Sequence, residues 1–109
     1  MKISLLVPSR ERINLKLTLI SSLISTCNDI KNIELIFGTD DDDPKKDLIE
    51  RICNNLSFVK NINIQNNKKF IGINKIWNTL YEHAEGDIIG YIGDDMIFKT
   101  PGWDSMIID

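Results

Sequence analysis

Short apolar segments alternate with longer segments of helical periodicity, and this order constrains the fold more than any other feature. The apolar segments are residues 3–7, 33–37, 58–64 and 88–92. Between them, apolar side chains recur at helical spacing in residues 15–27, 44–56 and 73–84. Strands that alternate with helices form parallel sheets joined by right-handed crossovers. We therefore expect an α/β fold, a three-layer Rossmann-like, mostly parallel sheet with the strand order 3-2-1-4.

The composition indicates one domain spanning residues 1–109, because 109 residues with 42% hydrophobic content suit a single modest core. A net charge of −3 provides no overall basic field, which argues against a nucleic-acid partner. No apolar run is long enough to span a membrane. Cys27 and Cys53 lack a metal-binding spacing and each lies in a helical pattern. They are therefore predicted to be reduced, packed thiols in a cytoplasmic protein.

Polar residues follow three of the four expected strands. These endings are Pro8-Ser9-Arg10-Glu11-Arg12, Gly38-Thr39-Asp40-Asp41-Asp42-Asp43 and Gly93-Asp94-Asp95. In an open parallel sheet, ligands bind beyond the carboxyl ends of the strands, so the predicted strand order brings these endings to one rim. Adjacent carboxylates repel each other, and a bound cation would offset that repulsion. Carboxylate oxygens suit Mg²⁺ or Mn²⁺, which bridge to substrate phosphates. The rim therefore indicates a site for a metal-bound nucleoside diphosphate, with Arg10 and Arg12 as further phosphate donors.

Three stretches, "SLLVPSRER", "IELIFGTDDDDP" and "GINKIWNTLYEHAEGDIIGYIGDDMIF", together resemble the nucleotide-binding half of a family 2 type glycosyltransferase with the GT-A fold. The most specific part runs from a glycine-led helix that carries an asparagine, through a Gly-Asp pair and an apolar strand, to an Asp-x-Asp motif. Gly72, Asn78, Gly86 and Asp87 occupy the matching positions. The resemblance implies a nucleotide-diphosphate sugar as donor, with a UDP-sugar favoured. The nucleotide-binding residues that it implies are Pro8, Ser9, Arg10, Glu11, Thr39, Asp40, Asp41, Asn78 and Asp94.

The Asp-x-Asp position departs from the family pattern. When the sequence is aligned on Gly86-Asp87, the first Asp falls on Gly93, and Asp95 matches the last. The resemblance therefore implies Asp95, with Asp94, as ligands of Mn²⁺ or Mg²⁺. Enzymes of this family continue into an acceptor-binding half that carries the catalytic base of inverting members. We therefore expect the chain to be a truncated, donor-binding portion, with neither acceptor nor general base assigned.

Several of these residues also have a purely structural interpretation. Asp42 and Asp43 are expected to be solvated acids before a helix, with Asp43 as its N-cap and Pro44 as its first residue. Arg10 is favoured over Arg12 as a phosphate donor, because it lies nearer the end of its strand. Trp103 is expected either to stack on a sugar or to pack against the end of the sheet. The remaining structural expectations are a hydrogen bond to a loop for Asn78, a core position for Trp77, a backbone role for Gly72, a helix-end position for His83, and solvated loop charges for Lys68 and Lys69.

Four functions are compared. The first is a metal-dependent glycosyltransferase that moves a sugar from a nucleotide donor to an unknown acceptor. A sugar nucleotidyltransferase would need a glycine-rich loop after strand one, which Val7-Pro8-Ser9-Arg10 does not supply. A phospho-receiver domain would need its acid pair after strand one, where this chain has Pro-Ser-Arg. The runner-up is a non-catalytic remnant that binds a nucleotide or a partner chain, such as a homodimer formed through an unpaired sheet edge.

Overall fold

The structure is a computed structural model that describes residues 1–64 and 73–108. Its elements are β1 (Ile3–Pro8), α1 (Ile13–Thr26), the 3₁₀ turn η1 (Ile30–Asn32), β2 (Ile33–Asp40), α2 (Lys46–Asn54), β3 (Val59–Ile64), α3 (Ile73–Glu82), β4 (Ile88–Tyr91) and α4 (Trp103–Ile108). The predicted loop at residues 66–69, with its lysines, and the backbone role of Gly72 lie outside the described residues. All four predicted strands and all three predicted helices are present, and α4 is an addition.

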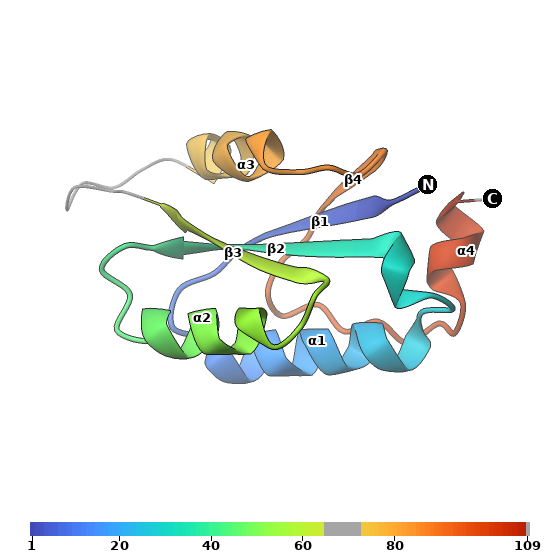
Figure 1. The fold of residues 1–109 in the computed structure, drawn as a ribbon, viewed down its shortest axis with the longest axis horizontal. Coiled ribbons are helices and arrows are strands. Elements are labelled where there is room, and N and C mark those ends of the chain that lie inside the picture. Colours follow the sequence, from blue (N-terminus) through green and yellow to red (C-terminus); the bar gives the residue numbers. More distant parts are fainter. Residues whose placement is uncertain (65–72, 109) are drawn as a thin grey trace.

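The four strands form one sheet with the order β3-β2-β1-β4, as predicted. All three strand pairings are parallel, with Leu5 of β1 opposite Leu35 of β2 and Gly90 of β4. Helices α1 and α2 cover one face of the sheet and α3 covers the other, which produces the three predicted layers (Figure 1). Because β1 and β2 are central and covered on both faces, they are apolar along most of their length, as buried parallel strands require.

The core is divided by the sheet. On the α1 face, Leu5 and Val7 pack with Leu19 and Phe37 in the larger cluster. On the α3 face, Leu6 packs with its own smaller set of apolar side chains, which are Ile36, Ile64 and Leu80. Successive residues of β1 alternate between these clusters, because side chains of a strand alternate between its two faces. Trp77 packs against the smaller cluster, as predicted, and its ring meets that of Tyr91 edge-on.

Helix α4 returns the chain to the end of α1. Trp103 is buried, its indole Nε1 donates to Thr26 Oγ1 at 3.0 Å, and its ring lies 4.3 Å from that of Phe98. The fully buried Asp104 carboxylate accepts hydrogen bonds from the backbone N–H groups of Asn28 and Asp29 at 2.8 and 3.0 Å. Trp103 is therefore a packing residue, and the alternative of stacking on a sugar is wrong.

The two cysteines are unpaired, as predicted. Burial raises the pKa of the Cys53 thiol to about 11, so this side chain stays protonated and packs as a small apolar group. None of the helices in the described part of the chain is long and apolar enough to cross a membrane.

Candidate nucleotide-binding site

A cavity of about 660 Å³ opens at the carboxyl ends of the central strands. This volume is within the range of small-molecule sites. The cavity is lined by Pro8, Ser9, Arg10, Glu11, Arg12, Gly38, Asp40, Ile64, Ile76 and Asp94. It therefore combines the ending of β1 with parts of β2, β3, α3 and the segment after β4. This is the rim where ligands of open parallel sheets bind.

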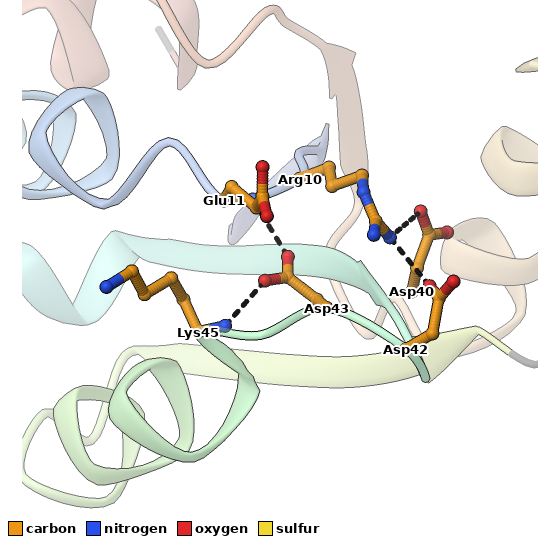
Figure 2. Close-up of polar contacts among 6 residues, drawn as sticks. All are labelled: Arg10, Glu11, Asp40, Asp42, Asp43 and Lys45. Carbon is orange, nitrogen blue, oxygen red and sulfur yellow. Dashed lines mark hydrogen bonds and ion pairs between the residues drawn. The ribbon is translucent and has the colours of Figure 1, made fainter.

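The loop that follows β1 forms one wall of the cavity. It starts with a hydrogen bond from the Ser9 backbone N–H to the Gly38 carbonyl of β2, at 3.0 Å. Glu11 then adopts a left-handed backbone conformation, with φ of 62°, which is uncommon for a residue other than glycine. The Glu11 backbone N–H donates to Asp43 Oδ2 at 2.8 Å (Figure 2). This unusual loop conformation is therefore held by a carboxylate from the β2–α2 connection.

Asp43 contradicts the prediction that it is a solvated acid. It is buried, and its Oδ1 accepts from the Lys45 backbone N–H at 2.8 Å while Oδ2 binds the β1–α1 loop. Helix α2 begins at Lys46, so the predicted N-cap at Asp43 and first helical residue at Pro44 are also wrong. The Asp-Pro pair forms a turn before the helix, where an Asp side chain commonly bonds the backbone two residues on.

Asp94 holds the same loop from the other side. The Ser9 hydroxyl donates to Asp94 Oδ2 at 2.7 Å, and the Arg12 guanidinium donates to Oδ1 at 3.2 Å. The Asp94 side chain is only 8% exposed, whereas that of Arg12 is 64% exposed. A buried carboxylate is stable when its oxygens accept hydrogen bonds. Arg12, ranked below Arg10 from the sequence, thus makes the ion pair to the buried acid, and its exposed side chain remains able to reorient toward a ligand.

Arg10 forms an outer group of charges at the same rim. Its Nη1 lies 2.6 Å from Asp42 Oδ1 and 3.1 Å from Asp40 Oδ2 (Figure 2). The hydrogen bond to Asp42, followed by that to Asp40, raises the pKa of the Arg10 guanidinium above its ordinary value. The Arg10 side chain is 45% exposed, so these pairs are screened by water and contribute little to stability. Such a group is suited to exchanging its partners when an anion arrives.

Four predicted site residues do not line the cavity. Thr39 is fully buried, and its hydroxyl donates to Asn61 Oδ1 at 2.6 Å. Asp41 donates its backbone N–H to the Ile64 carbonyl at the end of β3. Asn78 is exposed on α3, and Asp95 is exposed beyond the buried Asp94. The structure thus brings together Pro8, Ser9, Arg10, Glu11, Asp40 and Asp94, while the nucleotide contacts of all these residues stay predictions.

The Gly-Asp pair lies at the opposite end of the sheet. A Cβ atom on Gly86 would lie 2.4 Å from Ser4 Oγ and 2.8 Å from the Lys2 carbonyl oxygen. Asp87 Oδ2 accepts a hydrogen bond from the Lys2 backbone N–H at 3.0 Å. The pair therefore allows the chain to approach β1 closely as it enters β4, and its role here is structural. His83 also lies outside the cavity, with its Nδ1 3.0 Å from the Thr79 carbonyl on α3.

Sequence reasoning missed Lys16, which is buried on α1 next to this site. Lysine is rarely fully buried, so a residue scan assigns it to the surface. The signal was its spacing, because Lys16 precedes the buried Leu19 and Ile20 by three and four residues on the same helix.

No group of three or more potential metal-ligating side chains occurs within residues 1–64 and 73–108. Mg²⁺ and Mn²⁺ sites that include substrate phosphates need only one or two carboxylates. The cavity is lined by two arginines and by three carboxylates, Glu11, Asp40 and Asp94, so acidic groups are in excess there. Additional positive charge would favour the binding of a diphosphate next to this excess. The donor set is therefore compatible with a divalent cation held by Asp94 or Asp95.

No protein-family model and no curated protein matches the sequence. Among solved structures, Staphylococcus aureus TarS 1–349 in complex with UDP superposes with a TM-score of 0.77 at 18% identity, over 99% of this chain and 31% of TarS 1–349. The chain has a GT-A-like glycosyltransferase fold. The recognised resemblance is thus confirmed at the level of fold.

Two further structures agree with this assignment. TarS 1–349 in complex with UDP-GlcNAc matches with a TM-score of 0.69 at 22% identity, over 87% of this chain and 27% of its own. The mannosyltransferase PcManGT from Pyrobaculum calidifontis, in complex with GDP-Man and Mn²⁺, matches with a TM-score of 0.70 at 13% identity, over 88% and 28% of the two chains. The chain therefore spans less than a third of the matched chain in each of these three structures.

Proposed function

We propose that this chain binds the nucleoside diphosphate part of a nucleotide sugar and provides the donor site of a metal-dependent glycosyltransferase. The observation that carries the proposal is the cavity at the carboxyl ends of the strands. There, Arg10 and Arg12 of the β1–α1 loop lie close to Asp40 and Asp94. The fold shared with TarS and PcManGT, whose structures contain UDP, UDP-GlcNAc or GDP-Man, supports it. A UDP-sugar is the favoured donor.

Each group has a defined task in this proposal. Arg10 and Arg12 exchange their present carboxylate partners for the diphosphate, with which guanidinium groups form charge-assisted hydrogen bonds. Asp40, at the end of β2, accepts hydrogen bonds from the ribose or base. The Ser9 hydroxyl keeps Asp94 oriented toward the cavity. These groups bind and orient the donor while the bond between the anomeric carbon and the diphosphate oxygen breaks and the sugar bonds to the acceptor.

The metal would be held by Asp95 and Asp94, with the diphosphate completing its coordination. When bound, Mn²⁺ or Mg²⁺ would neutralise charge on the diphosphate as it leaves. Asp94 accepts one hydrogen bond at each oxygen, and each oxygen has a second lone pair that could ligate the metal. Because the Arg12 side chain is 64% exposed, it could also move into water and leave Oδ1 to the metal.

The runner-up is a nucleotide-binding or interaction domain without transferase activity. The specific observation that favours it is that Asp40 and Asp94, two carboxylates that line the cavity, are paired with Arg10 and Arg12 and so are not free to act as a general base. Incubation with UDP-GlcNAc and Mn²⁺, followed by detection of released UDP, distinguishes the two. Binding without UDP release, with and without added glycan acceptors, would favour the binding domain.

The decisive experiment is calorimetric titration of UDP into the protein, with and without Mn²⁺, and then with GDP in place of UDP. We expect Mn²⁺-dependent binding of UDP. The Asp95→Ala variant should lose about tenfold or more in affinity with Mn²⁺ present, a change of about 1.4 kcal/mol. Without Mn²⁺, the variant and the wild type should bind equally weakly.

The matched control is Asp47→Ala, which removes an exposed carboxylate in the first turn of α2, outside the cavity lining. It should leave UDP affinity unchanged. Failure of the wild type to bind UDP, GDP or other nucleoside diphosphates would contradict the proposal. Equal affinity for UDP with and without Mn²⁺ would support the donor site but contradict its dependence on a metal.

A further inference from the structure

Lys16 is a buried amine on α1 that interacts with Asp43 and Asp94, the two acids bonded to the β1–α1 loop. It lies on the face of α1 that packs against the sheet, and only 1% of its surface is exposed. Among the described residues, its Nζ has no hydrogen-bond partner. The nearest aromatic contact is with Phe37 of β2, whose ring centroid is 5.8 Å from Nζ. A cation–π contact at this distance offsets only part of the cost of desolvating an ammonium group.

Packing alone does not account for a lysine at this position. A methionine has similar length and would fill the space without the cost of burying a polar group. Desolvation lowers the pKa of the Lys16 amine, and the charges of Asp43 and then Asp94 oppose this effect. The two carboxylates that favour the ammonium form are therefore the same two that hold the β1–α1 loop.

Asp43 and Asp94 hold that loop from opposite sides. Asp43 accepts from the Glu11 backbone N–H, and Asp94 accepts from the Ser9 hydroxyl and the Arg12 guanidinium. Both carboxylates are buried, so their attraction to a buried cation is poorly screened. The Arg12 side chain is largely exposed, so water weakens its attraction to Asp94. Lys16 is the buried cation in the described structure that interacts with both acids.

We propose that Lys16 is a positioning residue, whose buried charge attracts the Asp43 and Asp94 carboxylates and so holds the β1–α1 loop in the shape that forms the cavity wall. Its effect on ligand affinity rests on the proposed function, but its effect on the loop does not. Lys16 does not line the cavity, so it acts through the two carboxylates and makes no contact with the ligand.

The test uses the Lys16→Met variant and two measurements. Hydrogen exchange of the Glu11 backbone amide reports on the loop, and urea unfolding reports on the whole domain. We expect the Glu11 amide to exchange at least tenfold faster in Lys16→Met, while the free energy of unfolding stays the same or rises. If the wild type binds UDP, the variant should bind at least tenfold more weakly. Lys31→Met, which removes an exposed lysine at η1, is the matched control and should change none of these quantities.

A double variant tests the electrostatic reason. Asp43→Asn keeps one oxygen, which can accept from Glu11 in place of Lys45, and removes one of the two charges that attract Lys16. In that background, Lys16→Met should accelerate Glu11 exchange by less than it does in the wild type, because one of the two attractions is already absent. Lys16→Gln, which keeps a polar end, replaces the methionine variant should the latter fail to fold.

The outcomes separate the two proposals. Unchanged Glu11 exchange in Lys16→Met, or a uniform loss of protection through the domain together with a lower unfolding free energy, would overturn the positioning role. Absence of UDP binding by the wild type would overturn the proposed function alone, because the exchange measurement needs no nucleotide.

Discussion

The two ends of the sheet both contain buried carboxylates, but they use them differently. At the amino end, near the N-terminus in Figure 1, Glu34 accepts from Ser4 Oγ at 2.8 Å, from the Glu85 backbone N–H at 2.9 Å, and from Lys60 Nζ at 2.7 Å. At the carboxyl end, Asp94 is paired with a largely exposed arginine, and the buried Lys16 amine has no hydrogen-bond partner among the described residues. Saturated polar groups stabilise one conformation, whereas exchangeable ones can bind a ligand. From this comparison we propose that the first end stabilises the fold and that the second end binds the ligand.

The largest effect is expected from Gly86→Ala at the amino end. Its new Cβ would overlap Ser4 Oγ and the backbone of Lys2 and Ser4, none of which can move without disturbing β1. We expect a loss of about 3 kcal/mol in the free energy of unfolding, measured by urea denaturation. The matched control is Gly93→Ala at the carboxyl end, where the Cβ would meet the Asp95 side chain, which is exposed and can move aside. Equal losses in the two variants would contradict the comparison.

The next effect is expected from Glu34→Gln, which removes the charge that pairs with Lys60. We expect a loss of about 2 kcal/mol in unfolding free energy at pH 7, because charge-assisted hydrogen bonds are weakened in a buried position. Protection of the Glu85 backbone amide against hydrogen exchange should also decrease in Glu34→Gln, because that amide donates to Glu34. A change within about 0.5 kcal/mol, the size of ordinary surface substitutions, would show that this network does not stabilise the fold.

Glu34 also predicts a pH dependence. Burial alone would raise the pKa of its carboxyl, but the hydrogen bonds from Glu85, Lys60 and Ser4 lower it below its ordinary value. A lowered pKa in the folded state contributes stability above the unfolded-state pKa, and that stability is lost as the pH falls through the folded-state value. Unfolding free energy should therefore decrease on acidification below about pH 4.5 in the wild type, and less steeply in Glu34→Gln. Parallel pH profiles of the two proteins would contradict this assignment.

The smallest effect on stability is expected from Arg12→Ala at the carboxyl end. Because this side chain is 64% exposed, its loss should change the unfolding free energy by about 1 kcal/mol or less. UDP affinity, measured by calorimetry, should nevertheless fall about tenfold, since a charge-assisted hydrogen bond to phosphate is lost. The exposed Arg51 of α2 supplies the control, and Arg51→Ala should leave both quantities unchanged. A large loss of unfolding free energy in Arg12→Ala would contradict the comparison, because it would show that the charge pairs at the carboxyl end also stabilise the fold.

Much of this arrangement could be predicted from the order of the chain. Apolar runs alternating with helical segments predicted the parallel sheet and its order, because few topologies satisfy right-handed crossovers with short connections. The same order brought Ser9, Arg10, Asp40 and Asp94 to one cavity. Asp43 could not be predicted, since an Asp-Pro pair before a helix has the same sequence whether it faces water or a neighbouring loop. Helix α4 was missed because its six residues are too few to show a helical period.

The sequence by itself determined the layers, the strand order and the rim on which the polar residues gather, because hydrophobic periodicity and chain connectivity act along the chain. Only the tertiary structure decided which of the clustered acids are buried and which are solvated. Asp43 is buried by a loop 32 residues away along the chain, Asp94 by a serine 85 residues away, and Lys16 by the sheet beneath its helix. Burial and charge pairing depend on neighbours in space, and these neighbours decide which carboxylates hold the loop and which remain available to a ligand.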